Sequence, residues 1–98
     1  MIVFTPEAAR QVRALRQHYE ERDRPEAARG LATALEAAWR KIVTTPGMGL
    51  PAPRSYPNLA RSGQRWIKAG RYWIVYSSEG KPTIVGVFYE TADIPRRV

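Results

Sequence analysis

The chain has 98 residues, of which 44% are hydrophobic and 26% are charged. This composition is typical of one folded domain, expected over residues 1–98; it excludes an intrinsically disordered protein, and the absence of cysteine excludes disulfide bonds and thiolate metal sites. The formal net charge of +7 favours anionic partners, either nucleic acid or an acidic protein segment.

The amino-terminal residues 1–4 form a short apolar run, which predicts a first strand at an edge of the sheet. They lack a basic region followed by an apolar core, so we expect no signal peptide. No stretch approaches the roughly 18 consecutive apolar residues of a membrane-spanning helix. We therefore expect a protein of the cytoplasm.

Two amphipathic helices are predicted next. Thr5 is suited to cap the first, and Pro6 suits its first turn; its apolar stripe comprises Ala8, Val12, Leu15 and Tyr19. Asp23 and Pro25 are expected to open the second, which the Pro/Gly-rich residues 44–57 end; its stripe comprises Ala28, Leu31, Leu35, Ala38, Trp39 and Ile42. The short gap between the helices favours an antiparallel hairpin.

From residue 65 onward, β-branched and aromatic residues dominate. Residues 65–69, 71–77 and 83–90 predict three antiparallel strands, with a turn at residues 78–82. The middle strand is apolar on both faces, so we expect it to be central and covered on each side. The predicted fold class is α+β, in the order β-α-α-β-β-β, with a helical hairpin packed on a small antiparallel sheet.

The basic charge is concentrated in the second half of the chain. Residues 1–49 hold eight basic and six acidic side chains, whereas residues 50–98 hold eight basic and three acidic side chains. No acid lies between Arg54 and Arg71. Such a field attracts nucleic acid or an acidic protein segment, although a basic surface without a dedicated partner is the alternative.

Few groups in the chain are suited to catalysis. His18 is the only histidine and lies beside the apolar stripe of the first helix, which is typical of a surface or boundary residue. The acids Glu20, Glu21 and Asp23 lie among arginines, where we expect solvated salt bridges rather than a metal site. No Gly-rich phosphate loop or serine nucleophile motif occurs. We expect neither a metal nor a cofactor.

One enzymatic route remains, the cleavage of RNA by basic residues and a tyrosine. Basic side chains neutralise the phosphate in such a site, while another group transfers a proton. Unperturbed tyrosine and lysine titrate near 10, so either needs a strongly shifted pKa to act as a base at neutral pH. For the basic side chains and the tyrosine of the sheet, contact with an acidic partner or with solvent is favoured over catalysis. The candidates for the nuclease are Arg65, Lys68, Arg71 and Tyr89.

Taken in order, these elements resemble the RelE/ParE superfamily of type II toxins over nearly the whole chain. The resemblance rests on "GRYWIVY" at residues 70–76, the turn at residues 79–80, and "VFYETADIPRR" at residues 87–97. ParE toxins typically have a Gly-Arg-Tyr element before the apolar strand, and residues 70–72 match it. The sequence is therefore more similar to the ParE branch than to the RelE branch.

Two positions differ from the patterns of these branches. ParE toxins typically end the last strand with a histidine, followed after a short link by an aspartate; here Tyr89 and Asp93 stand at those positions. RelE-type ribonucleases tend to carry an arginine inside the central strand, where this sequence has Trp73. The second difference weakens the ribonuclease interpretation, and the first makes the sequence an atypical ParE.

The resemblance implies a toxin that poisons DNA gyrase without catalysing a reaction itself. It implies a ParD-like antitoxin whose acidic or amphipathic segment wraps the toxin in a hetero-oligomeric complex and whose other part contacts operator DNA. The alternative is a RelE-like, ribosome-dependent mRNA endonuclease, and a third interpretation is a binding partner without toxicity. We expect residues 55–70 to contact the antitoxin. The residues expected to contact antitoxin or target are Arg54, Arg61, Arg65, Lys68, Arg71, Trp73, Tyr89, Asp93, Arg96 and Arg97.

Overall fold

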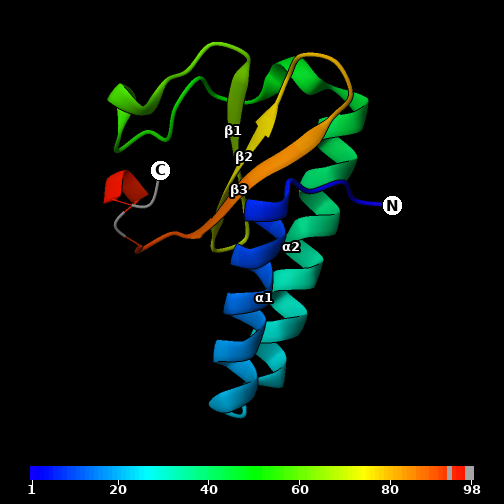
Figure 1. The fold of residues 1–98 in the computed structure, drawn as a ribbon, viewed down its shortest axis with the longest axis vertical. Coiled ribbons are helices and arrows are strands. Elements are labelled where there is room, and N and C mark those ends of the chain that lie inside the picture. The colour runs from blue at the N-terminus through cyan, green and yellow to red at the C-terminus, as the bar shows by residue number, and fades with distance from the viewer. Residues whose placement is uncertain (93, 97–98) are drawn as a thin grey trace.

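A helical hairpin packs on one face of a three-stranded antiparallel sheet (Figure 1). The computed structural model describes residues 1–92 and 94–96. The helices are α1 (Pro6–Glu21) and α2 (Pro25–Thr44), and the strands are β1 (Gln64–Ala69), β2 (Tyr72–Ser77) and β3 (Thr83–Tyr89), with β2 in the centre. Short 3-10 turns are η1 (Pro46–Met48), η2 (Pro57–Leu59) and η3 (Ile94–Arg96). The α+β class and the three predicted strands are confirmed.

The predicted start of α1 is confirmed, and that of α2 needs one correction. The Thr5 hydroxyl accepts a hydrogen bond from the Ala8 amide at 3.2 Å, which caps α1. Pro25 occupies the first turn of α2, but Arg24, not Asp23, is the residue at its cap. Asp23 has a φ of 51° and forms the reversal between the helices instead. Aspartate tolerates this left-handed conformation better than most residues, which explains its place in the turn.

The expected amino-terminal strand is reduced to a single parallel bridge between Phe4 and Ile84. The Thr5 amide donates to the Ile84 carbonyl at 2.9 Å, and the Ile84 amide donates to the Val3 carbonyl at 2.8 Å. α1 begins at the next residue, so the chain turns away from β3 before a second pair can form. Further along β3, the Gln11 side chain of α1 accepts the Val87 amide at 2.8 Å. The run therefore lies at the edge of the sheet as expected, without forming a strand.

Each face of the sheet has its own apolar core. On the helix side, Leu31, Leu35 and Ile42 of α2 pack with Ile74 and Tyr76 of β2. Alternate residues of β2 point to the opposite face, so the expectation that both faces of this strand are covered is confirmed. The core of the opposite face comprises Ala52, Leu59, Trp66, Val75, Phe88 and Ile94.

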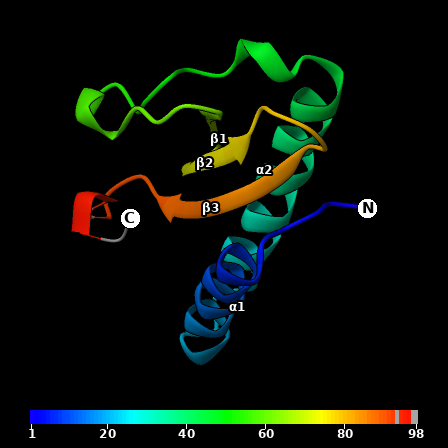
Figure 2. The ribbon, with the colours of Figure 1, turned by 45° about the horizontal axis from the view of Figure 1, so that its top comes forward.

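The cover of the second face is an irregular segment, residues 50–62, which we call the outer layer. Figure 2 shows it on the side of the sheet away from α1. Tyr76 secures the segment that leads into it, because its hydroxyl donates to the Pro46 carbonyl at 2.6 Å and accepts the Gly49 amide at 3.1 Å. The helical hairpin extends beyond the sheet at its closed end (Figure 1). This overhang creates the candidate site described next.

Candidate functional site

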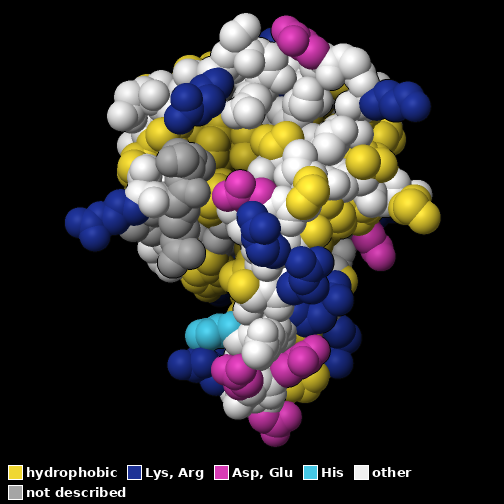
Figure 3. Space-filling model, in the orientation of Figure 1, with side chains coloured by type: hydrophobic (Ala, Val, Ile, Leu, Met, Phe, Trp, Pro, Cys, Tyr) yellow, Lys and Arg dark blue, Asp and Glu magenta, His cyan; other side chains and the backbone are white. Residues whose placement is uncertain are grey.

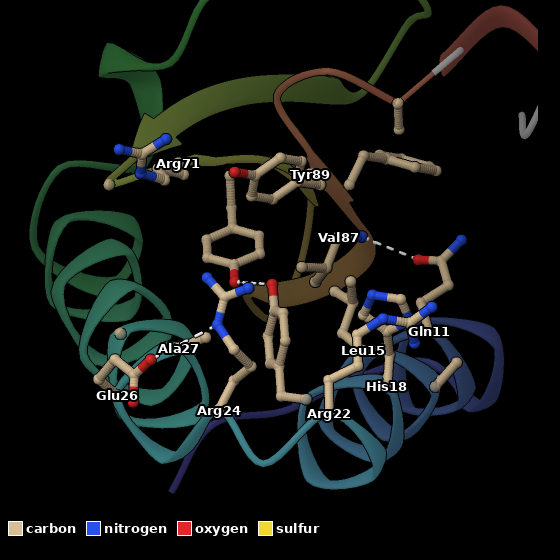
Figure 4. Close-up of a pocket in the computed structure, with 17 residues that line it drawn as sticks. Gln11, Leu15, His18, Arg22, Arg24, Glu26, Ala27, Arg71, Val87 and Tyr89 are labelled. Atoms are coloured by element: carbon tan, nitrogen blue, oxygen red, sulfur yellow. Dashed lines mark hydrogen bonds and ion pairs between the residues drawn. The ribbon is translucent and has the colours of Figure 1, made fainter.

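A cleft of about 1100 Å³ lies in the angle between the overhanging hairpin and the sheet. We call it the hairpin cleft; it is bounded by α1 from Gln11 onward with its cap residue Arg22, the start of α2, the β1–β2 turn and the end of β3. Arg71 and Tyr89 lie on its sheet side, and His18, Arg22 and Arg24 lie on its helix side (Figure 4). The cleft thus joins the helical hairpin to two segments of the sheet that lie far from it in the sequence.

The floor of the cleft is a cluster of three tyrosines. The hydroxyls of Tyr19 in α1 and Tyr72 in β2 share a hydrogen bond. The rings of Tyr72 and Tyr89 meet edge to face, with centroids 5.7 Å apart. Burial and the bond to Tyr19 raise the pKa of Tyr72 above its usual value. The raised pKa keeps the Tyr72 hydroxyl protonated and uncharged at physiological pH.

The rim of the cleft carries mainly positive charge. Arg71 is exposed in the β1–β2 turn, and its hydrogen bond to Tyr89, with the nearby negative charge of Glu90, raises its pKa. Arg22 makes a hydrogen bond with His18 Nδ1 at 3.0 Å, and Arg24 pairs with Glu26 at 3.5 Å. Both pairs are exposed, so they hold these side chains only weakly. A partner's carboxylates can replace them.

The four nuclease candidates do not converge on one point. Arg71 and Tyr89 are in contact at the cleft, whereas Lys68 Nζ pairs with Glu90 at 3.4 Å. Arg65 is half-buried near the other end of β1, where its guanidinium donates to the Gly49 carbonyl at 3.0 Å. That bond gives Arg65 a role in holding the segment before the outer layer.

The remaining predicted contact residues lie mostly on the face opposite the helices. Arg54 and Arg61 are exposed in the outer layer, and Arg96 is exposed in η3. Trp73 is half-buried beside Lys68, its partner across β1 and β2. Asp93 and Arg97 lie outside the described residues.

Sequence reasoning did not assign Tyr19, Arg22, Arg24 or Tyr72 to a site. A signal for the overhang was nevertheless present in the lengths of the elements. A helix of 20 residues such as α2 spans about 30 Å, whereas a strand of six residues spans about 20 Å. The apolar stripe of α1 therefore runs past the end of the sheet, and Tyr19 lies at that end.

Two further features are absent from the described part of the chain. No group of three or more histidine, aspartate or glutamate side chains is arranged there to hold a metal ion. No helix within residues 1–92 and 94–96 combines the length and the apolar character that crossing a membrane requires.

Comparison with known proteins agrees with this architecture. The family model described as the ParE toxin of the type II toxin-antitoxin system, parDE, matches residues 2–89. A solved structure of the chromosomal ParDE system from P. aeruginosa is similar, with a TM-score of 0.65 and 19% identity over 91% of this chain and 96% of the other. At that identity the likeness shows the fold alone, and no curated protein matches the sequence. Since the family model covers most of its length, the chain belongs to the ParE toxin family of type II toxin–antitoxin systems.

Proposed function

We propose that this ParE-family toxin inhibits DNA gyrase and is neutralised by a ParD-like antitoxin whose acidic amphipathic segment occupies the hairpin cleft. The family match over residues 2–89 carries the proposal. The complex is hetero-oligomeric and cytoplasmic, and the antitoxin supplies the contact with operator DNA. The structure supports the placement of the antitoxin segment through the shape and charge of the cleft.

The hairpin cleft combines the two features that an acidic amphipathic segment requires. Leu15 and the tyrosine cluster offer an apolar floor, whose burial is worth about 25 cal/mol per Å² of apolar surface. Arg22, Arg24 and Arg71 stand around it, and positive charge at a rim speeds association with an acidic partner. An amphipathic helix presents apolar and acidic residues on adjacent faces, which matches this arrangement.

The positions of the nuclease candidates favour gyrase inhibition over mRNA cleavage. Arg65 bonds to the Gly49 carbonyl, and the Lys68 ammonium is paired with Glu90. Tyr72 is not one of these candidates, but its ring packs on Tyr89, and its raised pKa leaves even less phenolate at neutral pH than an ordinary tyrosine has. This arrangement supports a function that needs no proton transfer.

The target is tested by measuring supercoiling and translation side by side with purified protein. We expect inhibition of gyrase supercoiling and trapping of gyrase–DNA cleavage complexes, with translation unaffected. Tyr89→Phe should keep this effect, because the proposed function needs no proton transfer from its hydroxyl. No effect on gyrase at doses that arrest growth would refute the proposal, and codon-linked mRNA cuts would establish the alternative. Harmless overexpression would instead support a binding partner without toxicity.

The antitoxin's place is tested with two double charge reversals of equal size. We expect Arg24→Glu/Arg71→Glu in the cleft to weaken the complex with the cognate antitoxin on the order of 100-fold, since like charges then face its carboxylates. The matched variant Arg54→Glu/Arg61→Glu in the outer layer should change the affinity only a few-fold, through net charge. A larger loss of affinity in Arg54→Glu/Arg61→Glu than in the cleft variant would place the antitoxin on residues 55–70 instead. Isothermal titration calorimetry at fixed salt gives both affinities.

A further inference from the structure

The longest acid-free stretch of the chain builds much of the face of the molecule opposite the helical hairpin. Residues 37–78 contain seven basic and no acidic side chains. They include the end of α2, where Arg40 and Lys41 lie, as well as the whole outer layer and strands β1 and β2. The exposed basic residues of the outer layer and β1 are Arg54, Arg61 and Lys68. By contrast, acidic and basic side chains alternate on the overhanging end of the hairpin (Figure 3). Positive charge is therefore less compensated on the outer face than on the helices.

The packing of the outer layer determines which of its side chains reach solvent. Ala52 and Leu59 point into the second core, with 8% and 7% of their surface exposed, so the layer is anchored through them. Arg54 and Arg61, which follow each anchor by two residues, are exposed. Ser55, Asn58 and Ser62 are exposed between and beside them. The polar side chains on the outer surface of this layer are thus arginine, hydroxyl and amide groups, and the exposed apolar ones beside them are the small Pro51, Pro57 and Ala60.

Two further basic residues extend this surface. Lys68 lies two positions along β1 from Trp66 and therefore shares its outer face. Its side chain is half-exposed and lies beside Trp73 of β2. Arg96 is exposed in η3, whose Ile94 is buried in the same core as Ala52 and Leu59. Among the described residues, Arg54, Arg61, Lys68 and Arg96 thus belong to one face.

Among the residues that the structure describes, two carboxylates border this face, those of Glu79 and Glu90. Glu90 pairs with Lys68 at 3.4 Å, so it competes with any anion for that ammonium. Glu79 lies in the β2–β3 turn beside Gly63, at the end of the outer layer. Both acids lie at the margin of the surface that Arg54 and Arg61 form, which leaves its middle positive.

We propose that this outer face binds the phosphate backbone of double-stranded DNA directly, without the antitoxin. Arginine, lysine, serine and asparagine side chains are the groups that usually contact phosphate oxygens. A protein partner would need an aromatic or aliphatic anchor in the centre of the interface. The large exposed apolar side chains among the described residues are Met1, Val3, Val43 and Met48, and none of them belongs to the outer layer. The chemistry of the face therefore fits duplex phosphate better than protein.

The binding requires no base contact, so it is independent of sequence and sensitive to salt. The affinity should fall with salt at a slope of about −0.9 for each phosphate neutralised, which predicts about −3 to −4 for the four basic residues. This inference goes beyond gyrase inhibition, because it concerns free DNA. A toxin that holds DNA itself would reach a DNA-bound target by a shorter search.

The test is fluorescence anisotropy with a labelled duplex of about 20 base pairs and arbitrary sequence, titrated with purified toxin at several KCl concentrations. Arg54→Gln/Arg61→Gln should weaken binding about tenfold and reduce the salt slope by about two. The matched control Arg10→Gln/Arg13→Gln removes the same charge from the exposed side of α1. It should change the affinity less than about threefold. Equal losses in the two variants would show bulk attraction only and would overturn the proposal.

A second variant should increase the affinity for DNA, so a loss of folding could not explain its expected effect. Glu90→Gln removes the carboxylate that competes for Lys68, so it should tighten DNA binding about threefold. Unchanged or weaker binding would count against Lys68 as a phosphate contact. Tighter binding of single-stranded RNA of the same length would overturn the assignment to duplex DNA. No gyrase is present, so this result is separate from the test of the proposed function.

Discussion

Replacing Tyr76 with phenylalanine tests how the outer layer is attached to the sheet. The Tyr76 side chain is fully buried, and its hydroxyl makes two hydrogen bonds, to the Pro46 carbonyl and from the Gly49 amide. Phenylalanine preserves the ring and its packing, so the variant isolates these two bonds. Gly49 is buried, whereas Pro46 is exposed and its carbonyl can bond to water instead.

The expected loss follows from this difference between the two partners. A buried amide left unpaired costs about 1–3 kcal/mol, and exchanging the Pro46 bond for water costs about 1 kcal/mol or less. The sum is about 1–4 kcal/mol, centred on about 2–3 kcal/mol, which is a large part of the 5–15 kcal/mol that stabilises a typical domain. For a domain of this size, such a loss lowers Tm by on the order of 10–20 °C.

Urea denaturation followed by tryptophan fluorescence measures the free energy of unfolding of both proteins. Tyr56→Phe is the control, because Tyr56 belongs to the same layer, its ring packs against the second core, and its hydroxyl has no hydrogen-bond partner among the described residues. The free energy of unfolding of Tyr56→Phe should be lower than that of the unchanged protein by less than about 0.5 kcal/mol. A comparable loss in the two variants would refute the role of the Tyr76 hydroxyl. The same segment is held by Arg65, whose guanidinium donates to the Gly49 carbonyl. Arg65→Ala removes this bond, so that variant would reduce toxicity through folding alone.

Three further predictions concern stability. Because the pKa of Tyr72 is higher in the folded than in the unfolded state, Tyr72 contributes stability that is fully present below its unfolded-state pKa of about 10 and is lost as pH rises through its folded-state pKa. The free energy of unfolding should therefore decrease above pH 10, and it should decrease less in Tyr72→Phe. Gly86→Ala places a methyl group 2.7 Å from Val75 and should cost about 1–3 kcal/mol in urea; wild-type stability would contradict the tight packing of β3 on β2. Gln11→Ala removes the acceptor of the Val87 amide and should cost about 1 kcal/mol, whereas Gln11→Glu retains an acceptor and should restore most of it; equal losses would exclude this bond.

Local signals in the sequence predicted most of the fold. Thr5 and Pro6 determine where α1 begins, because capping depends on residues within one turn. The two apolar faces of β2 predicted its central place, since alternation along a strand is also a local property. Family membership followed from the order and spacing of these elements along the chain, and the family match over residues 2–89 agrees.

The candidate site depended on contacts between distant residues. Tyr19 and Tyr72 share a hydrogen bond across 53 positions, and no local pattern indicates that they meet. The basic residues that looked like one group in the sequence are separated in space, because the pleat of β1 points Lys68 away from the helices, Arg65 bonds to Gly49, and the turn places Arg71 at the cleft. Charge and composition thus favoured an anionic partner, whereas the overhang of the helices past the shorter strands decided where a cleft could form.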